Sequence, residues 1–368
     1  MKRLVILAVA FLSVFLSIPA KADFISAKAA VLISSDTGEV LYSRNCDQRL
    51  PMASTTKIMT ALVVLEKGGL DRIVTVTGEM IRVEGTSMGL SSGDTLTVRD
   101  LLYGMMLVSG NDAANALAVS VGGSYDRFIA LMNKKARELG LCNTRFETPS
   151  GLDGERHYTS AYDLAMITKA AFLYEDFRKI VSTESIILSY GDPPCKRQLI
   201  NHNKLLKMYD DVAGVKTGFT KKSGRCLVSA AQKDGKSLIA VTLNDPDDWE
   251  DHRKLLDLGF STLKKQSLSG FDISIPVVGG NVRLNETVAQ KDICLSKEKE
   301  VTRTIIAPAF LYSPVKKGDT VGYADYCIGD ALIEREMIVS GRDIEYKKDP
   351  FGVFSLIFLT VLRCINEG

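Results

Sequence analysis

Ser54 and Lys57 are the first residues whose types and spacing could support chemistry. Ser54 opens a segment with helical periodicity, so Lys57 would lie one turn later on the same helix face. A lysine ammonium in a partly dry pocket loses its proton more readily than in water. It could then act as the base that makes the Ser54 hydroxyl a nucleophile without a histidine. The spacing alone is unspecific, because S-x-x-K recurs at 261–264, 296–299 and 313–316, and a serine that caps a helix is the alternative.

Two further segments place polar groups where an apolar element ends. Ser109-Gly110-Asn111 interrupts a strongly apolar helical pattern and predicts a loop turned toward a cleft, because serine, glycine and asparagine are poor helix formers. Lys216-Thr217-Gly218 occurs once, at the end of an apolar strand, and combines a cation, a hydroxyl and a glycine that lets a ligand approach the backbone. Taken singly, these segments are also compatible with an ordinary turn and a charged strand end.

The elements around these segments predict an α+β fold. A β-hairpin is expected at 29–42, where two apolar runs flank a glycine-containing turn, and an antiparallel meander at 212–243. Between them, 3- and 4-residue apolar spacing predicts helices, the first with Ser54 at its N-cap. These helices are expected over residues 54–65, 101–121, 125–139 and 161–173. The hairpin and the meander would form one antiparallel sheet with a helical insert, followed by a small all-β module.

In chain order the three segments read S-x-x-K, S-x-N and K-T-G, which resembles the penicillin-binding protein and serine β-lactamase superfamily. The sequence is most similar to the exported serine-type D-alanyl-D-alanine carboxypeptidases, the low-molecular-mass penicillin-binding proteins. Pro51-Met52-Ala53-Ser54-Thr55-Thr56-Lys57, Val108-Ser109-Gly110-Asn111-Asp112-Ala113 and Gly214-Val215-Lys216-Thr217-Gly218-Phe219 look like that family's three motifs. The resemblance covers roughly residues 24–262 and implies a serine β-lactamase/transpeptidase-like catalytic domain. The C-terminal β module and the terminal segment resemble the family's stalk and anchor.

The resemblance implies an acyl-enzyme mechanism that needs no metal or cofactor. Ser54 would attack the carbonyl between the two terminal D-alanines of a peptidoglycan stem peptide, with Lys57 as general base. Ser109 would relay a proton toward the leaving amine, and water would then release the shortened peptide. β-Lactams would acylate Ser54 in the same way.

The resemblance also implies a set of substrate-binding groups. Asn111 would hold the substrate amide, Lys216 would supply positive potential, and Thr217 would bind the terminal carboxylate. Gly218 would allow close approach to the backbone, and the N–H of Phe219 would complete an oxyanion hole with the N–H of the nucleophile.

The sequence departs from the family pattern after the strand that follows K-T-G. Some relatives carry an arginine there that helps to bind the carboxylate, whereas residues 244–249 are acidic here and the next arginine is Arg253. Carboxylate contacts beyond Thr217 are therefore left unassigned. Trp249, the only tryptophan, could line the rim of the site, although a packing role is the simpler expectation.

Two other functions fit parts of the pattern. A class A β-lactamase would use a glutamate to activate the deacylating water, but no E-x-x-L-N segment lies between the second and third motifs. A non-catalytic protein that binds cell-wall peptides would not need Lys57 as a base. The net charge of +2 argues against a nucleic-acid partner, and the lack of C-x-x-C and H-E-x-x-H patterns argues against a zinc site.

Composition predicts four parts in the 368-residue chain. Residues 1–22 have a basic start, an apolar middle and an A-x-A end, which predicts a secretory signal peptide; an uncleaved anchor is the alternative. Residues 23–265 would form the catalytic domain and 266–346 the all-β domain. In 347–368, the uncharged run 351–362 would make a helix of about 18 Å, too short to cross a hydrocarbon layer of roughly 30 Å. It predicts an amphipathic helix on the membrane surface, with a helix packed on the protein body as the alternative, so the protein would be exported and peripherally anchored.

Overall fold

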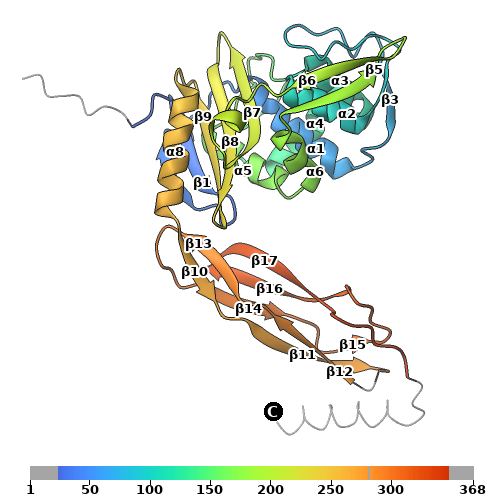
Figure 1. Ribbon diagram of the computed structural model, residues 1–368, viewed down its shortest axis with the longest axis vertical. Coiled ribbons are helices and arrows are strands. Elements are labelled where there is room, and N and C mark those ends of the chain that lie inside the picture. Colours follow the sequence, from blue (N-terminus) through green and yellow to red (C-terminus); the bar gives the residue numbers. More distant parts are fainter. Residues whose placement is uncertain (1–23, 281, 348–368) are drawn as a thin grey trace, which may run out of the picture.

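The structure is a computed structural model that describes residues 24–280 and 282–347. The predicted signal peptide and the apolar run of the predicted anchor lie outside these residues. Within the described ranges, no helix has both the length and the apolar character needed to cross a membrane. Figure 1 shows an upper part, in which helices flank a sheet, and a narrow all-β part below it.

A five-stranded antiparallel sheet forms the centre of the upper part, in the order β2-β1-β9-β8-β7. Its strands are β1 (Ala29–Ser34), β2 (Val40–Arg44), β7 (Val212–Thr220), β8 (Gly224–Lys233) and β9 (Lys236–Leu243). β1 pairs with β9, from Ala29 opposite Leu243 to Ser34 opposite Leu238. The N-terminal hairpin and the late meander therefore join in one sheet. Every residue of β1 is buried, because both faces of the sheet are covered.

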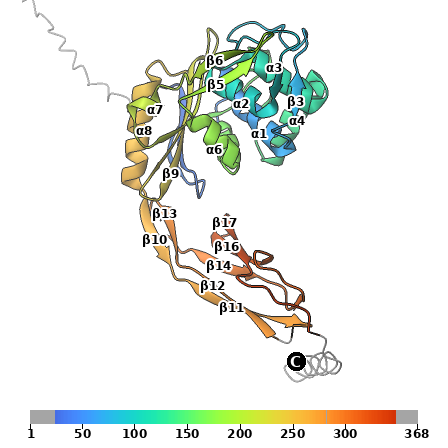
Figure 2. The ribbon, with the colours of Figure 1, turned by 45° about the vertical axis from the view of Figure 1, so that its right-hand side comes forward.

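Helices cover the two faces of this sheet, and the predicted α+β class is confirmed. α8 (Asp248–Thr262) packs on one face, where Leu32, Leu227 and Leu255 share a buried cluster. The other face carries α5 (Ala161–Ala171) and α6 (Glu175–Ser182). α1 (Lys57–Lys67) packs on α5, and α2 (Val98–Leu107), α3 (Asn111–Gly122) and α4 (Tyr125–Glu138) pack on α1, so that these six helices form one group. Figure 2 shows α8 on one side of the sheet and this helix group on the other.

Short elements complete the upper part of the molecule. They are β3 (Ile73–Thr75), β4 (Thr95–Thr97), β5 (Ser185–Tyr190), β6 (Cys195–Ile200) and α7 (Leu205–Met208). β3 pairs with β4, and β5 pairs with β6, in two small antiparallel ribbons.

The first helix begins differently from the sequence-based expectation. Ser54 does not cap it: this residue lies in a 3-10 turn, Ala53–Thr56, and α1 begins at Lys57 with Thr56 as its N-cap. Ala53 has a φ of +47°, in the left-handed region that a non-glycine residue adopts only at an energetic cost. The expectation failed because helical periodicity does not distinguish a 3-10 turn from the first turn of an α-helix.

The lower part consists of small β-sheets. The strands are β10 (Lys264–Leu268), β11 (Phe271–Val278), β12 (Val282–Val288), β13 (Lys291–Leu295), β14 (Thr302–Ile306), β15 (Leu311–Tyr312), β16 (Thr320–Ile328) and β17 (Ala331–Val339). They pair as β10-β13, β12-β11-β15 and β14-β16-β17 around a core that includes Leu284 and Tyr326. Glu39 of the upper part accepts hydrogen bonds from the Ser296 N–H and from Lys299 Nζ, which connects the two parts. We propose a domain boundary near β10, close to the expected 265/266 division.

Candidate active site

The 3-10 turn and α1 bring the Ser54 hydroxyl and the Lys57 amine together. Lys57 Nζ lies 2.9 Å from Ser54 Oγ, 2.8 Å from Asn111 Oδ1 and 2.6 Å from the carbonyl oxygen of Ser150, and it donates to all three. Lys57 is fully buried. Two acceptors from distant parts of the chain, Asn111 and Ser150, therefore fix the amine against the serine oxygen.

Burial is the main influence on the protonation of Lys57. It lowers the pKa of the amine well below its usual value, the nearby charge of Lys216 lowers this pKa further, and Asp112 acts in the opposite direction. No carboxylate contacts the amine among its described hydrogen bonds. Lys57 can therefore give up its proton and accept the proton of the Ser54 hydroxyl.

Lys216 is the second buried amine of the site. Burial lowers its pKa to about 7, and its Nζ donates to the carbonyl oxygen of Thr217 at 3.1 Å. The amine is therefore partly protonated near neutral pH, and its charge disfavours a second cation on Lys57. The two lysines suit different tasks, Lys57 as a base and Lys216 as a source of positive potential.

The loop between α2 and α3 is the predicted turn toward a cleft. Ser109 has a φ of +61°, and Gly110 is the N-cap of α3. A Cβ atom at Gly110 would lie 2.8 Å from Asp112 Oδ1 and 3.1 Å from the backbone nitrogen of Met88. This crowding leaves space only for glycine and sets Ser109 directly before the helix that carries Asn111.

Asp112, which had no expected role, fastens a neighbouring loop to α3. Its buried carboxylate accepts hydrogen bonds from the Ser87 hydroxyl and from the N–H groups of Met88, Gly89, Leu90 and Ala113. The loop in turn holds Asn111, whose Nδ2 donates to the carbonyl oxygen of Glu84 at 2.7 Å. Both polar atoms of the Asn111 side chain are thus engaged, one with this loop and one with Lys57.

Strand β7 forms the opposite wall and lies at the edge of the sheet. A Cβ atom at Gly218 would lie 3.0 Å from the backbone nitrogen of Ser54 and 3.1 Å from the carbonyl oxygen of Met52. Glycine therefore lets β7 approach the turn that carries the nucleophile. Gly151 has a similar role, because a Cβ atom there would lie 2.0 Å from the carbonyl oxygen of Ala53.

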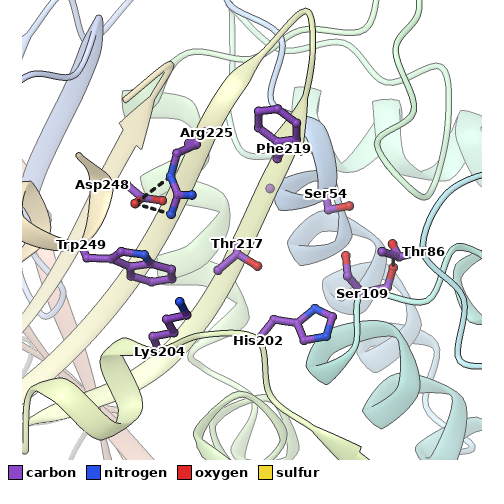
Figure 3. A pocket seen from close by; sticks show the side chains of 11 residues that line it. Ser54, Thr86, Ser109, His202, Lys204, Thr217, Phe219, Arg225, Asp248 and Trp249 are labelled. Carbon is purple, nitrogen blue, oxygen red and sulfur yellow. Dashed lines mark hydrogen bonds and ion pairs between the residues drawn. The ribbon is translucent and has the colours of Figure 1, made fainter. Parts of the chain in front are cut away.

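A cavity of about 360 Å³ opens between β7 and the turn before α1. Five of the residues expected in the site line it: Ser54, Ser109, Thr217, Gly218 and Phe219. Lys57 and Asn111 lie behind them in direct contact with Ser54 or with each other. Figure 3 shows Thr217 across the cavity from Ser54 and Ser109.

The remaining lining residues had no expected role in the site, apart from Trp249. They are Thr86, His202, Lys204, Arg225, Asp248 and Trp249. Trp249 packs beside the α8 cluster, as expected, and it also lines the rim of the cavity, which was the other expectation for this residue. Arg225 lies on β8 directly opposite Phe219, and only knowledge of this strand pairing could have linked it to the K-T-G segment.

Comparisons with known proteins agree with this arrangement. The sequence model of the peptidase S11 family, described as D-alanyl-D-alanine carboxypeptidase, matches residues 17–247. The chain is 37% identical to the D-alanyl-D-alanine carboxypeptidase DacF of Bacillus subtilis, over 80% of this chain and 73% of that protein. It is 32% identical to the D-alanyl-D-alanine carboxypeptidase DacC of Escherichia coli, over 88% and 86% of the two chains. The crystal structure of the Streptomyces K15 DD-transpeptidase superimposes with a TM-score of 0.61 at 35% identity, covering 64% of this chain and 98% of that one.

Proposed function

Since the chain belongs to the D-alanyl-D-alanine carboxypeptidase family, we propose that it removes the terminal D-alanine from peptidoglycan stem peptides through an acyl-enzyme on Ser54. The observation that carries this proposal is the contact of 2.9 Å between the Ser54 hydroxyl and the buried Lys57 amine. Burial keeps this amine available as a base, and the cavity gives a peptide access to the serine oxygen. The activity assigned is that of a serine-type D-Ala-D-Ala carboxypeptidase.

Acylation would begin with a proton transfer from the Ser54 hydroxyl to Lys57. The serine oxygen forms a bond to the carbonyl carbon of the penultimate D-alanine, and the carbonyl oxygen becomes an oxyanion. The N–H groups of Ser54 and Phe219 donate to this oxyanion. Ser109 gives its proton to the leaving amine as the carbon–nitrogen bond breaks, and it takes up the proton that Lys57 received from Ser54. D-Alanine leaves, the ester remains on Ser54, and Lys57 is neutral again.

Deacylation would reverse these roles with water as the nucleophile. Lys57 takes a proton from the water, the water oxygen bonds to the ester carbon, and the proton returns to the Ser54 oxygen as the ester bond breaks. The enzyme is thereby restored without a metal or cofactor. A β-lactam would follow the acylation step and remain on Ser54, because the ring opens without losing a leaving group from the site.

Three further side chains would bind and orient the peptide. Thr217 would bind the terminal carboxylate, and Lys216 would supply positive potential from the side of β7 that faces the nucleophile. Asn111 would contact the substrate amide. Its described hydrogen bonds to Lys57 and to Glu84 also support a role in positioning the base.

The test is an assay of the purified chain with a peptide that ends in D-Ala-D-Ala. We expect release of D-alanine and, with penicillin, a mass increase by one inhibitor molecule. Ser54→Ala should abolish both, whereas Ser261→Ala, the first residue of another S-x-x-K segment, should leave both unchanged. Penicillin labelling without D-alanine release would favour a peptide-binding protein, and rapid penicillin turnover would favour a β-lactamase.

We also propose export and peripheral attachment to the membrane through residues 347–368. The support is the uncharged run 351–362, which lies outside the described residues. Deletion of this run should move the protein from the membrane fraction to the soluble fraction of cells that express it. An unchanged distribution would contradict the proposal.

A further inference from the structure

We propose that Arg225 binds the terminal carboxylate of the substrate together with Thr217, and that Asp248 positions Arg225 for this task. The inference rests on the proposed function, because it concerns the peptide that the site would cleave. It fills the gap left by the acidic segment 244–249, where the sequence offers no arginine.

The pairing of β7 with β8 places Arg225 and Thr217 on the same face of the sheet. Thr217 pairs with Leu227, and Phe219 pairs with Arg225. Paired residues share a face, as do alternate residues along a strand, so Thr217 and Arg225 are diagonal neighbours roughly 7–8 Å apart. A long side chain spans this distance, and both residues line the cavity that contains Ser54 (Figure 3).

Lys216 lies on the other face of β7. It alternates with Thr217 along the strand and shares its face with Gly218. At Gly218 this face lies directly against the turn before α1, where a Cβ atom would nearly touch the backbone nitrogen of Ser54. Lys216 is therefore directed toward the nucleophile, and Arg225 toward the part of the cavity beyond Thr217. A peptide bound along this edge strand would therefore contact Lys216 and Arg225 through different atoms of the peptide.

Asp248 and Trp249 hold the Arg225 side chain in place. Arg225 Nε and Nη2 donate to Asp248 Oδ1 at 3.0 and 2.7 Å, and Arg225 Cζ lies 5.6 Å from the centroid of the Trp249 ring. The Asp248 side chain is only 4% exposed, whereas that of Arg225 is 43% exposed. The aspartate thus occupies one edge of the guanidinium. The remaining N–H groups donate to no residue in the described part of the chain, so they can donate to a second carboxylate.

Acidic residues near Arg225 give a further reason for a cation at this place in the cavity. The segment before and at the start of α8 is acidic, with Asp245, Asp247, Asp248, Glu250 and Asp251. An anionic peptide end would be repelled by these groups unless a cation lay between them and the cavity. Arg225 has that position, since it binds Asp248 and lines the cavity at once.

The test compares two substrates in three variants of the full chain. The substrates are a D-alanyl thioester with a free terminal carboxylate and its methyl ester, which lacks the charge. Arg225→Gln should lower kcat/KM for the carboxylate substrate by about 30-fold, chiefly through KM, and change it for the ester by less than about 2-fold. Lys204→Gln, which removes the other exposed cation of the cavity wall, should lower kcat/KM by less than about 3-fold for both. Equal losses on both substrates for Arg225→Gln, or a larger loss for Lys204→Gln, would overturn the inference.

Asp248→Asn separates positioning from charge. Removal of this acid makes the wall more positive, so a role through charge alone predicts a lower KM for the carboxylate substrate. Loss of the hydrogen bonds between Arg225 and Asp248 predicts a KM about 5-fold higher, because the Arg225 side chain must then be ordered when the substrate binds. A lower KM would refute the positioning role of Asp248.

A second measurement keeps this test independent of the proposed function. The rate of penicillin acylation, followed by intact mass, should fall by a similar factor in Arg225→Gln and remain unchanged for penicillin methyl ester. This rate reports on Arg225 even if the wild-type chain releases no D-alanine, which would count against the carboxypeptidase proposal alone. Equal acylation of wild type and Arg225→Gln by penicillin would overturn the inference, and thermal melting confirms that each variant is folded.

Discussion

Replacement of Asp112 by asparagine should damage stability and acylation together. The carboxylate receives hydrogen bonds at both oxygens: Oδ1 from the N–H groups of Met88 and Ala113, and Oδ2 from the Ser87 hydroxyl and from two further N–H groups of the same loop. An asparagine keeps one acceptor oxygen and puts an NH₂ group in place of the other. Whichever way the amide turns, at least two backbone N–H groups then face a donor.

The size of the effect follows from this count. A hydrogen bond to a charged acceptor contributes about 1.5–3 kcal/mol, and some of the loss is recovered when the loop moves toward water. We therefore expect Asp112→Asn to reduce the free energy of unfolding by about 3 kcal/mol. For a domain of this size, such a change lowers Tm by about 6–12 °C.

Acylation should fall for a separate reason. The loop that Asp112 fastens contacts Asn111, and Asn111 accepts a hydrogen bond from Lys57. The charge of Asp112 also raises the pKa of Lys57, so its loss lowers that pKa further and moves the acid limb of the acylation rate to lower pH. The measurement is the second-order rate constant of penicillin acylation at pH values between 5 and 9, and Tm is measured by calorimetry.

Asp94→Asn is the matched control, since Asp94 is also buried and also binds a loop N–H. Its carboxylate accepts from the Ser91 N–H alone among the described side-chain contacts, and an amide oxygen can keep that bond. We expect a small change in Tm and no shift of the acid limb. The reasoning fails if Asp112→Asn melts within about 2 °C of the wild type, or if its acid limb stays in place or moves to higher pH.

Three further substitutions test other contacts. Gly151→Ala would place a Cβ atom 2.0 Å from the carbonyl oxygen of Ala53, so penicillin acylation should fall by at least about 100-fold; a normal rate would show that the turn adapts. Glu39→Gln removes the charge that binds Lys299 and should weaken the contact between the two parts by about 1–2 kcal/mol, seen as faster amide exchange at the contact; unchanged exchange would contradict this. Burial lowers the pKa of His157 to about 4 from 6.5, so the stability it contributes is complete above pH 6.5 and is lost as the pH falls toward 4, by up to about 3 kcal/mol. Urea unfolding at pH 7 and 4.5 should show a smaller decline in His157→Gln than in the wild type, and equal declines would refute this.

The central sheet was predictable because its signals are local. Apolar alternation and glycine turns mark β1, β2 and the β7–β9 meander, and only their pairing across the sheet is non-local. The β5–β6 ribbon was not anticipated, since its exposed residues give no clear alternation. Its position depends on distant contacts such as the hydrogen bond from the Tyr190 hydroxyl to the carbonyl oxygen of Met88, which no local pattern reveals.

In the active site, too, residues with a local sequence signal could be predicted, and residues that act through distant contacts could not. Ser54 and Lys57 were linked by their spacing, and the structure places them in contact. The carbonyl oxygen of Ser150, which also binds the amine, carries no sequence signal because every residue has one. The role of Asp112 was hidden for another reason: an acid at the start of a helix is common, and its partners lie on a separate loop.

The charges of the site explain why a relay and a neutralised arginine would suit this reaction. When Lys57 accepts the proton of Ser54, it becomes a second buried cation near Lys216, and the charge of Lys216 disfavours this protonated form. A hydroxyl at Ser109 that passes this proton to the leaving amine would relieve the repulsion before the ester forms. A further free cation near the carboxylate would depress the pKa of Lys57 still more, and of Lys216 with it. Arg225 avoids this because Asp248 balances its charge, so it would donate directed hydrogen bonds to the substrate without adding net positive charge to the site.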